Sequence, residues 1–321
     1  ILPMGLSEDD SPAALTCAMG ACVTGCGRLL EQVQPDICLV LGDRYETLSV
    51  VSAALVSRVP VAHLCGGDVT HGAFDDAIRH AITKMSALHF VTNEDAARRV
   101  RQLGEDPAHI IKSGSPGIDR ILAQPVVARD VFLAEIGLPA DQEYMLVSFH
   151  PETLCEDKAT QLSALITALE ECPQTGLLLS GSNADPGGQA INRAFIALAR
   201  TRDNAVFHLS LGTKLYFSAM AHARLLIGNS SSGVYEAPSF GIPTVNIGER
   251  QAGRPRAASV IDCAATSDAI VRAITRARSL NCEGVANPYG KGGSAQIILE
   301  YLAQIDDPML LLKKIFQDHA I

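Results

Sequence analysis

Short apolar runs rich in β-branched residues alternate along the chain with stretches whose apolar positions recur at helical spacing. Such runs, bounded by turn residues, are typical of buried parallel strands. The predicted strands are 37–42, 61–65, 87–92, 110–113, 145–149, 176–180, 205–209, 224–228 and 244–247. The predicted helices between them include 46–57, 75–86, 94–103, 158–170, 188–199, 214–222 and 234–240. This alternation predicts βαβ units and parallel sheets covered by helices on both faces.

The number of predicted strands indicates two domains. One doubly wound sheet holds roughly six strands, and a chain of this length accommodates two domains of roughly 100–200 residues each. The helical pattern is interrupted at Pro125, soon after the turn Gly114-Ser115-Pro116-Gly117. We therefore expect an N-terminal domain over 1–124 and a C-terminal domain over 125–321, whose last helix can pack back on the first domain. The predicted fold class is α/β, with two Rossmann-like domains facing each other across a cleft.

The composition narrows the class of function. The chain is 47% hydrophobic and 19% charged, with a formal net charge of −9. The apolar content excludes a disordered chain, and acidity without any basic run argues against a nucleic-acid surface. No apolar stretch reaches the ~20 residues of a membrane span, and the chain shows no secretory leader. We expect a cytoplasmic protein with neither a nucleic-acid nor a membrane partner.

Nine cysteines are scattered along the chain, an odd number without a Cys-x-x-Cys pair. This pattern predicts reduced thiols and not a disulfide framework. No Cys and His residues fall at the spacing of zinc ligands, so we expect no metal site.

A Gly/Ser-rich turn is the strongest motif for ligand binding, because ligands of doubly wound sheets bind at the carboxyl ends of strands. Gly228-Asn229-Ser230-Ser231-Ser232-Gly233 connects a predicted strand to a predicted helix. Its backbone N–H groups, its hydroxyls and the helix dipole suit a phosphate, and Glu236, expected in the first helical turn, can bind a ribose diol. The alternative is an ordinary helix N-cap. Arg250 and Arg254 after the next strand add two guanidinium groups, so diphosphate binding is the better interpretation.

Acidic side chains gather after the first two strands. Carboxylates that share a cleft raise one another's pKa values and supply both an acid and a base. The alternatives are helix capping by Asp43 and a solvated acidic loop. The group consists of Asp43, Glu46, Asp68, Asp75 and Asp76, with the cations Arg44, which can pair with Asp43 or Glu46, and Arg79.

Two further residues end strands of the second half. His150 precedes Pro151, which stops its strand, so we expect the imidazole at the same cleft, although a lone histidine is often structural. Asn183 follows the next strand and is a weaker signal.

The chain lacks G-x-G-x-x-G, Walker and G-x-S-x-G motifs, which disfavours bound NAD, ATP hydrolysis and acyl transfer. A diphosphate site together with carboxylates fits sugar-nucleotide chemistry.

The motifs as a set resemble the hydrolysing UDP-N-acetylglucosamine 2-epimerases of sialic-acid and legionaminic-acid synthesis, over nearly the whole chain. The resemblance is carried by Gly42-Asp43-Arg44-Tyr45-Glu46, Gly66-Gly67-Asp68, Asp75-Asp76-Ala77-Ile78-Arg79-His80-Ala81-Ile82-Thr83-Lys84, His150-Pro151, Gly228 to Glu236, Gly248 to Arg254 and Asn287-Pro288-Tyr289-Gly290. It implies the two-domain fold of the GT-B glycosyltransferases.

The resemblance also implies a reaction. A UDP-2-acetamido sugar loses its C2 proton and its UDP to form a glycal, and water then adds to give the free C2-inverted sugar, without a redox cofactor. Asp43, Asp68, Asp75 and His150 would be the catalytic residues. The substrate-binding residues would be Arg44, Asp76, Arg79, Asn183, Ser230, Ser231, Glu236 and Arg250. Family members are usually dimers or tetramers, so we expect a homo-oligomer.

Two departures from the family pattern qualify these expectations. Cys65 stands where family members often have a catalytic Glu, which shifts the expected acid–base role to Asp68 and Asp75. The chain also starts at Ile1 without the family's first strand and its Gly-Thr-Arg-Ala-Asp-like loop, so we expect that roughly one N-terminal βα unit is missing.

Three other functions remain open. The Gly-Asp-Arg-Tyr-Glu and Asp-Asp-x-Ile-Arg-His forms favour a hydrolysing enzyme over a non-hydrolysing epimerase, which would form UDP-ManNAc. A glycosyltransferase on the same fold would need an acceptor. Cys65 and the missing unit also allow an inactive nucleotide-sugar-binding remnant. The sequence does not distinguish UDP-GlcNAc from UDP-N,N′-diacetylbacillosamine as the substrate.

Overall fold

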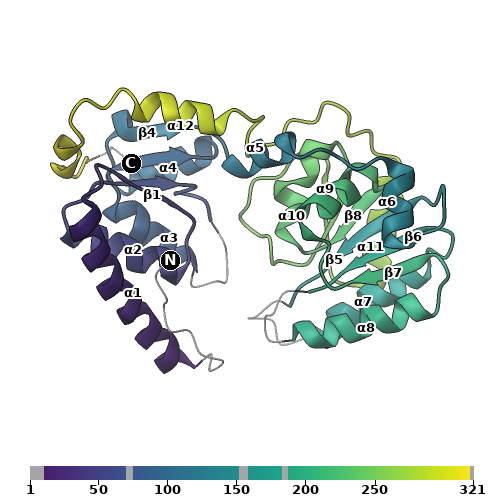
Figure 1. The fold of residues 1–321 in the computed structure, drawn as a ribbon. Coiled ribbons are helices and arrows are strands. Elements are labelled where there is room, and N and C mark those ends of the chain that lie inside the picture. Colours follow the sequence, from purple (N-terminus) through teal and green to yellow (C-terminus); the bar gives the residue numbers. More distant parts are fainter. Residues whose placement is uncertain (1–10, 70–74, 152–157, 183–186, 319–321) are drawn as a thin grey trace. The chain divides into compact units, whose positions relative to one another are not determined.

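The computed structural model describes residues 11–69, 75–151, 158–182 and 187–318. The chain forms two compact units (Figure 1). Unit 1 consists of Ile1–Pro116 together with Gly292–Ile321, and unit 2 consists of Gly117–Lys291. Each unit has its own parallel sheet and its own core.

Unit 1 is built on a four-stranded parallel sheet in the order β1-β2-β3-β4. Its strands are β1 (Cys38–Leu41), β2 (Val61–Leu64), β3 (Leu88–Val91) and β4 (Ile110–Lys112). Its helices are α1 (Pro12–Val33), α2 (Tyr45–Val56), α3 (Asp75–Met85), α4 (Glu94–Gln102), α12 (Ser294–Leu302) and the short 3₁₀ turns η1 (Pro107–His109) and η3 (Pro308–Leu312).

Successive residues of the strands of unit 1 face two different cores, as the pleat of a strand requires. Val61 packs with residues of α2 and α3 on one face. Its neighbour Ala62 packs on the other face with Phe90 and with Ile298 of α12, which is far away in the sequence. The ring of Phe90 also meets Tyr301 edge to face, with 5.8 Å between the ring centroids. The end of the chain therefore completes the core of the first sheet.

Unit 2 has six parallel strands in the order β10-β9-β8-β5-β6-β7. The strands are β5 (Tyr144–Ser148), β6 (Gly176–Ser180), β7 (Ala205–His208), β8 (Leu225–Gly228), β9 (Thr244–Ile247) and β10 (Val260–Cys263). Its helices are α5 (Pro116–Ala123), α6 (Arg129–Ile136), α7 (Lys158–Glu170), α8 (Gly188–Arg200), α9 (Gly212–His222), α10 (Ser231–Tyr235), α11 (Ser267–Arg278) and the 3₁₀ turn η2 (Ala237–Phe240).

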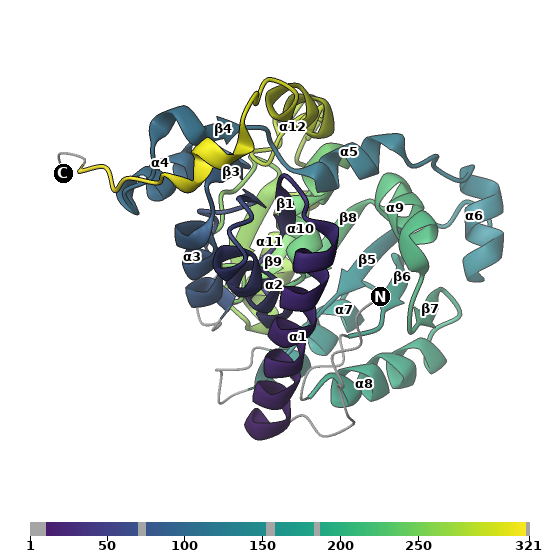
Figure 2. The ribbon, with the colours of Figure 1, turned by 60° about the vertical axis from the view of Figure 1, so that its left-hand side comes forward.

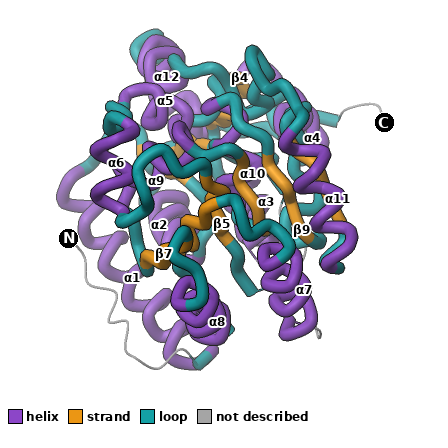
Figure 3. Tube along the Cα trace, turned by 90° about the vertical axis from the view of Figure 1, so that its right-hand side faces the viewer, coloured by secondary structure: helices purple, strands orange, loops and turns teal. Residues whose placement is uncertain are grey.

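The strand order of unit 2 positions its loops. The chain runs from β5 outward to β7, returns, and then runs from β8 outward to β10 on the other side. Helices α7, α8 and α11 cover one face of this sheet, and α5, α6 and α9 cover the other (Figure 3). At such a reversal of strand order the loops of the two central strands part, which leaves a crevice where ligands of this fold bind. The loops that follow β5 and β8 therefore flank the expected ligand position.

The predicted α/β class with two Rossmann-like, parallel-sheet domains is confirmed. All nine predicted strands are present with small shifts at their ends, but the sequence analysis missed β10. This strand is an edge strand in which only Ile261 is fully buried, so it lacks the continuous apolar run of β5 or β6.

The division between the units differs from the predicted boundary at 124/125, since it falls between Pro116 and Gly117. Helix α5 explains this difference, because Ile118 and Ile121 are buried in the core of unit 2. The segment 292–321 belongs to unit 1, where α12 contributes Ile298 to the core.

One prediction about the first helix is wrong. Among the described residues, Ala13–Val33 is long enough and apolar enough to cross a membrane, whereas no such stretch was expected. Its apolar character comes from small residues, and Gly20, Thr16 and Thr24 interrupt any obvious apolar run. Helix α1 lies along α2 and buries the Cys22–Cys26 side of its surface there (Figure 2).

Candidate functional site

The acidic residues of unit 1 converge on one cation. Arg79, in the third position after Asp76 on α3, is 4% exposed. Its guanidinium donates to the Asp76 carboxylate at 2.9 Å and to the backbone carbonyl of Asp68 at 2.8 Å. It also forms an ion pair with Asp43, which follows β1. The ends of β1 and β2 and the first turn of α3 are thus joined by one side chain.

Asp75 opens helix α3 beside this cluster, and it is half-buried. A carboxylate is favourable in the first turn of a helix, which explains why the sequence starts a helix there. Burial raises the pKa of the Asp75 carboxyl, and the Asp43 carboxylate raises it further, against the opposing effect of Arg44 and Arg79. Asp75 therefore holds a proton more readily than an exposed aspartate does.

Asp68 and Arg44 are placed differently. The hydroxyl of Thr92 donates to the Asp68 carboxylate at 2.7 Å, which orients that side chain toward the end of β3. Arg44 is exposed, forms an ion pair with Glu46 at 3.2 Å, and lies over the Tyr45 ring at 5.2 Å. Of the two partners considered for Arg44, the structure selects Glu46, while Asp43 pairs with Arg79.

A buried histidine supports the Asp43 loop, and the sequence analysis did not single it out. His63 on β2 is fully buried, and burial lowers its pKa to about 4, so the ring is neutral at neutral pH. Its Nε2 lies 2.9 Å from the carbonyl oxygen of Gly42 and its Nδ1 lies 3.1 Å from the Thr83 hydroxyl. Because a carbonyl only accepts, Nε2–H donates to Gly42 and Nδ1 is left as an acceptor. The Thr83 hydroxyl beside Nδ1 also donates to the backbone carbonyl of Arg79 at 2.9 Å, so its single proton lies between two acceptors. A histidine within an otherwise apolar strand was the available signal.

The turn after β8 contains the helix N-cap that was the alternative to a phosphate site. Ser230 caps α10, since its Oγ accepts from the backbone N–H of Ser232 at 3.4 Å. Gly228 has φ +141°, and a Cβ there would lie 1.9 Å from the carbonyl oxygen of Ser148, so this position requires glycine. Tyr216 is another group that the sequence analysis missed. Burial raises the pKa of its hydroxyl, and the neighbouring side chains of Ser232, Ser148 and Ser230 oppose this rise.

Helix α10 corrects one expectation. It has only five residues and ends at Tyr235, so Glu236 follows the helix instead of lying in its first turn. Pro238 enforces this change to a 3₁₀ turn, because proline lacks the N–H that a continuing helix needs. The short helix supplies little dipole, and the turn's donors are its N–H and hydroxyl groups. Burial raises the pKa of Glu236, against the effect of a hydrogen bond from Ser232 and the charge of Arg120.

The loops after β5 and β9 contact the same turn. His150 is 6% exposed, and its Nδ1 lies 3.3 Å from the Ser182 hydroxyl. Arg250 donates to the backbone carbonyl of Asn229 at 3.1 Å. Unit 2 therefore brings His150, Ser230, Ser231 and Arg250 to the carboxyl ends of its central strands. Asn183 lies outside the described residues.

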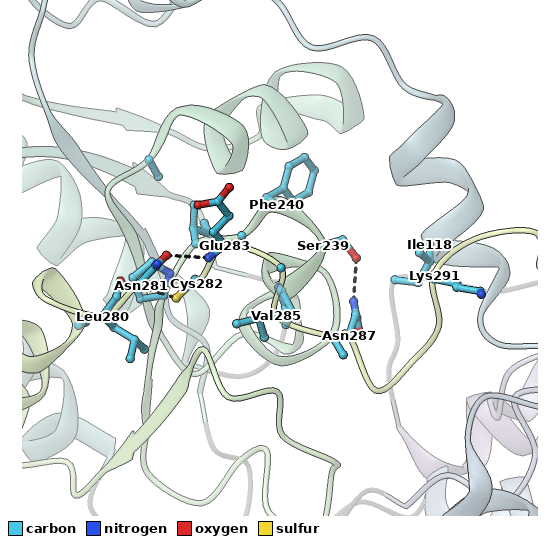
Figure 4. Close-up of a pocket in the computed structure, with 18 of the residues that line it drawn as sticks. Ile118, Ser239, Phe240, Leu280, Asn281, Cys282, Glu283, Val285, Asn287 and Lys291 are labelled. Atoms are coloured by element: carbon cyan, nitrogen blue, oxygen red, sulfur yellow. Dashed lines mark hydrogen bonds between the residues drawn. The ribbon is translucent and has the colours of Figure 1, made fainter.

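A separate cavity of about 720 Å³ lies at the opposite end of the sheet of unit 2. It is lined by Arg224 and Pro243, which precede β8 and β9, and by the loop that contains Glu283 and Asn287 (Figure 4). Asn287 donates to the Ser239 hydroxyl at 2.8 Å in this wall. The cavity is thus separate from the turn after β8, because that turn lies at the carboxyl ends of the strands and the cavity lies at their amino ends.

Comparison with known proteins adds the chemistry of relatives. The family model UDP-N-acetylglucosamine 2-epimerase matches residues 3–303. The GDP/UDP-N,N′-diacetylbacillosamine 2-epimerase (hydrolyzing) of Campylobacter jejuni is 36% identical over 269 residues, which are 81% of this chain and 68% of that protein. The UDP-N,N′-diacetylbacillosamine 2-epimerase (hydrolyzing) of Legionella pneumophila is 32% identical over 316 residues, or 98% and 82% of the two chains.

Solved structures agree on the fold. The UDP-GlcNAc 2-epimerase from Neisseria meningitidis, solved bound to UDP-GlcNAc, superposes with a TM-score of 0.70 and 16% identity, covering 94% of this chain and 84% of that one. The resemblance noted in the sequence is therefore confirmed by the family match, the relatives and the fold. The chain belongs to the UDP-N-acetylglucosamine 2-epimerase family.

Proposed function

We propose that this protein is a hydrolysing 2-epimerase that converts a UDP-2-acetamido sugar to UDP and the free, C2-inverted manno-configured sugar. The observation that carries the proposal is 32–36% identity, over most of the chain, to relatives named as hydrolysing UDP-sugar 2-epimerases. The Arg79-centred carboxylates and the Ser-rich turn supply the two kinds of group that this reaction uses.

Unit 2 binds the nucleotide in this proposal. Hydroxyls of Ser230 and Ser231 and the Arg250 guanidinium hold the diphosphate, and His150 lies beside it. The Glu236 carboxylate accepts hydrogen bonds from the ribose diol. When the C1–O bond breaks, its electron pair moves to the diphosphate oxygen, and these donors stabilise the charge that develops there. Fixed donors of this kind supply the largest contribution to many enzymatic rates.

Unit 1 supplies the proton transfers. As UDP leaves C1, a carboxylate removes the C2 proton, and a C1–C2 double bond forms. Water then adds its oxygen to C1, and a proton returns to C2 on the opposite face. Asp43, Asp68 and Asp75 carry these transfers, while Asp76 and Arg79 hold the sugar and the carboxylates in place. The pKa of Asp75, raised by burial and by the Asp43 carboxylate, makes this carboxyl a stronger base than an exposed aspartate and suits it to proton transfer.

The choice of substrate and pathway rests on the names of the relatives. We infer that the substrate is UDP-GlcNAc or UDP-N,N′-diacetylbacillosamine and that the product enters nonulosonic-acid synthesis of the sialic- or legionaminic-acid type. Elimination and addition consume no redox equivalent, so no redox cofactor takes part. We also infer a cytoplasmic homo-oligomer.

A proton NMR time course in D₂O tests the proposal, with each of the two UDP-sugars offered separately. We expect UDP and a free manno-sugar with deuterium at C2, and loss of both products in Asp75→Asn. Cys65→Ala should retain turnover, because the carboxylates and not the thiol carry the protons. UDP-ManNAc without free sugar would indicate a non-hydrolysing epimerase, and dependence on an acceptor would indicate a transferase. UDP binding without turnover would favour a binding remnant.

A further inference from the structure

The carboxyl ends of β5 and β8 meet where the strand order of unit 2 reverses. Ser148 and Gly228 are partners in the register of these two strands. Beyond this pair the loops would separate, because β5 continues toward α7 on one side and β8 toward α10 on the other. A side chain that bridges the loops at this point decides how far apart they lie.

Asn229 provides such a bridge. It is fully buried, and its backbone N–H donates to the Ser148 carbonyl at 3.2 Å. Its side-chain Oδ1 accepts from the backbone N–H of His150 at 2.7 Å, and its Nδ2 donates to the backbone carbonyl of His150 at 2.8 Å. The amide therefore pairs with both backbone groups of His150, as a neighbouring strand would, and extends the ladder past Gly228.

The backbone of Asn229 ties in a third loop. Its carbonyl oxygen accepts from Arg250 Nη1 at 3.1 Å and from Gln251 Nε2 at 2.8 Å. Gln251 is 2% exposed, so this second bond forms away from water. Asn229, in the loop after β8, thus contacts the loops after β5 and β9. Each of the three loops carries a residue of the proposed diphosphate site.

We propose that Asn229 is the positioning residue that fixes His150, the Ser230–Ser231 turn and Arg250 relative to one another, an inference that rests on the proposed binding of UDP by unit 2. Only an amide offers an acceptor and a donor in this geometry. A serine is too short to span the loops, and an aspartate would set an oxygen against the His150 carbonyl.

The test replaces the amide without adding charge. Asn229→Leu keeps the number and branching of the side-chain heavy atoms and removes both side-chain bonds, whereas Asn229→Asp would repel a diphosphate whatever its role. Asn281→Leu is the matched control, because Asn281 is exposed and borders the cavity at the far end of the sheet. UDP affinity is measured by calorimetry, and kcat and KM are measured by UDP release, on protein whose fold is checked by circular dichroism.

We expect Asn229→Leu to weaken UDP binding at least tenfold and to lower kcat at least tenfold, with little change in the control. The loss in kcat should shrink in a His150→Ala background, since there is no imidazole left to misplace; a merely structural role would multiply the two losses. If Asn229→Leu does not fold, Gln251→Met removes one bond to the Asn229 carbonyl and should weaken UDP binding several-fold. Unchanged UDP affinity and kcat in folded Asn229→Leu, or in Gln251→Met when that variant is the one tested, would overturn the inference.

The two proposals can fail separately. Wild-type protein that binds UDP but releases none from either UDP-sugar contradicts the proposed function. The loss of UDP affinity in Asn229→Leu would still support the positioning role under that outcome, because it is measured without turnover.

Discussion

The carboxylate of Asp43 is one cause of the raised pKa of Asp75, although Asp43 itself is ion-paired with Arg79. Burial of Asp75 is the larger cause, and Glu46 adds a further unfavourable charge. Like charges near a half-buried carboxyl favour its protonated form. The cluster therefore contains one carboxylate that is paired with a cation and another whose pKa is raised.

This relationship predicts the pH dependence of turnover. In Glu46→Gln a negative charge near Asp75 disappears and Arg44 loses its partner, and both changes lower the pKa of Asp75. If ionised Asp75 accepts the C2 proton, the acid limb of kcat/KM should move to lower pH. The pH profile of UDP release measures this shift, with the exposed Glu94→Gln as a control. An acid limb that stays in place would show that Asp75 does not control the step.

Arg79 should be important for stability as well as for the site. Arg79→Ala leaves the carboxylates of Asp43 and Asp76 without their cation, and we expect a loss of about 2–4 kcal/mol in the free energy of unfolding. Arg98→Ala is the control, because Arg98 pairs with Asp95 on the exposed face of α4, where such a pair contributes about 0–1 kcal/mol. Urea unfolding of the three proteins measures both values. Equal losses in the two variants would contradict the buried role of Arg79.

His63 predicts an acid-sensitive contribution to stability. The pKa of His63 in the folded protein is about 4, below the ordinary value of 6.5. Between pH 4 and pH 6.5 the unfolded chain therefore binds a proton at His63 that the folded chain does not bind. The contribution is complete above pH 6.5 and is lost as the pH falls from 6.5 to 4, at roughly 1 kcal/mol per pH unit. Urea unfolding at pH 7 and pH 5 should show a smaller difference for His63→Gln than for wild type. The same difference in both proteins would refute the assignment.

Glu236 should recognise the ribose of UDP. Its carboxylate offers two acceptors, whereas the amide of Glu236→Gln offers one, so we expect UDP affinity to fall roughly tenfold to hundredfold. Calorimetry with UDP and with 2′-deoxy-UDP provides the test. Removal of the 2′-hydroxyl should weaken binding to wild type but have little effect on the variant. Glu249→Gln, on an exposed neighbouring position, serves as the control. An equal penalty for 2′-deoxy-UDP in both proteins would place Glu236 away from the diol.

The parts of the fold that were predictable are those that local pattern determines. Every residue of β5 and β6 is buried, so their sequences are continuous apolar runs and were recognised. Helix α1 was missed, because small residues such as Cys22 and Cys26 pack against α2 without forming an obvious apolar face. Strand β10 was missed for the related reason that Asp262 is exposed.

Charge and spacing identified the candidate site only in part. Asp43, Asp75 and Arg79 stand out as chemical groups, but the pairing of Arg79 with a residue 36 positions away depends on the sheet. Asn229 and His63 act through backbone carbonyls and amides, which no side-chain motif reports. Long-range contacts to the main chain are therefore the part of the site that the sequence could not reveal.

Two glycines should respond to the same substitution with opposite signs. A Cβ at Gly228 would lie 1.9 Å from the Ser148 carbonyl oxygen, so Gly228→Ala should push β8 from β5 and cost about 3 kcal/mol or more. Gly20 lies inside α1 with no atom within 4 Å of such a Cβ, and Gly20→Ala should stabilise by up to about 1 kcal/mol. Urea unfolding measures both, and calorimetry should show lost UDP binding only in Gly228→Ala. Wild-type stability and UDP affinity in Gly228→Ala would mean that the two backbones do not approach so closely, and the bridge formed by Asn229 would lose its geometric basis.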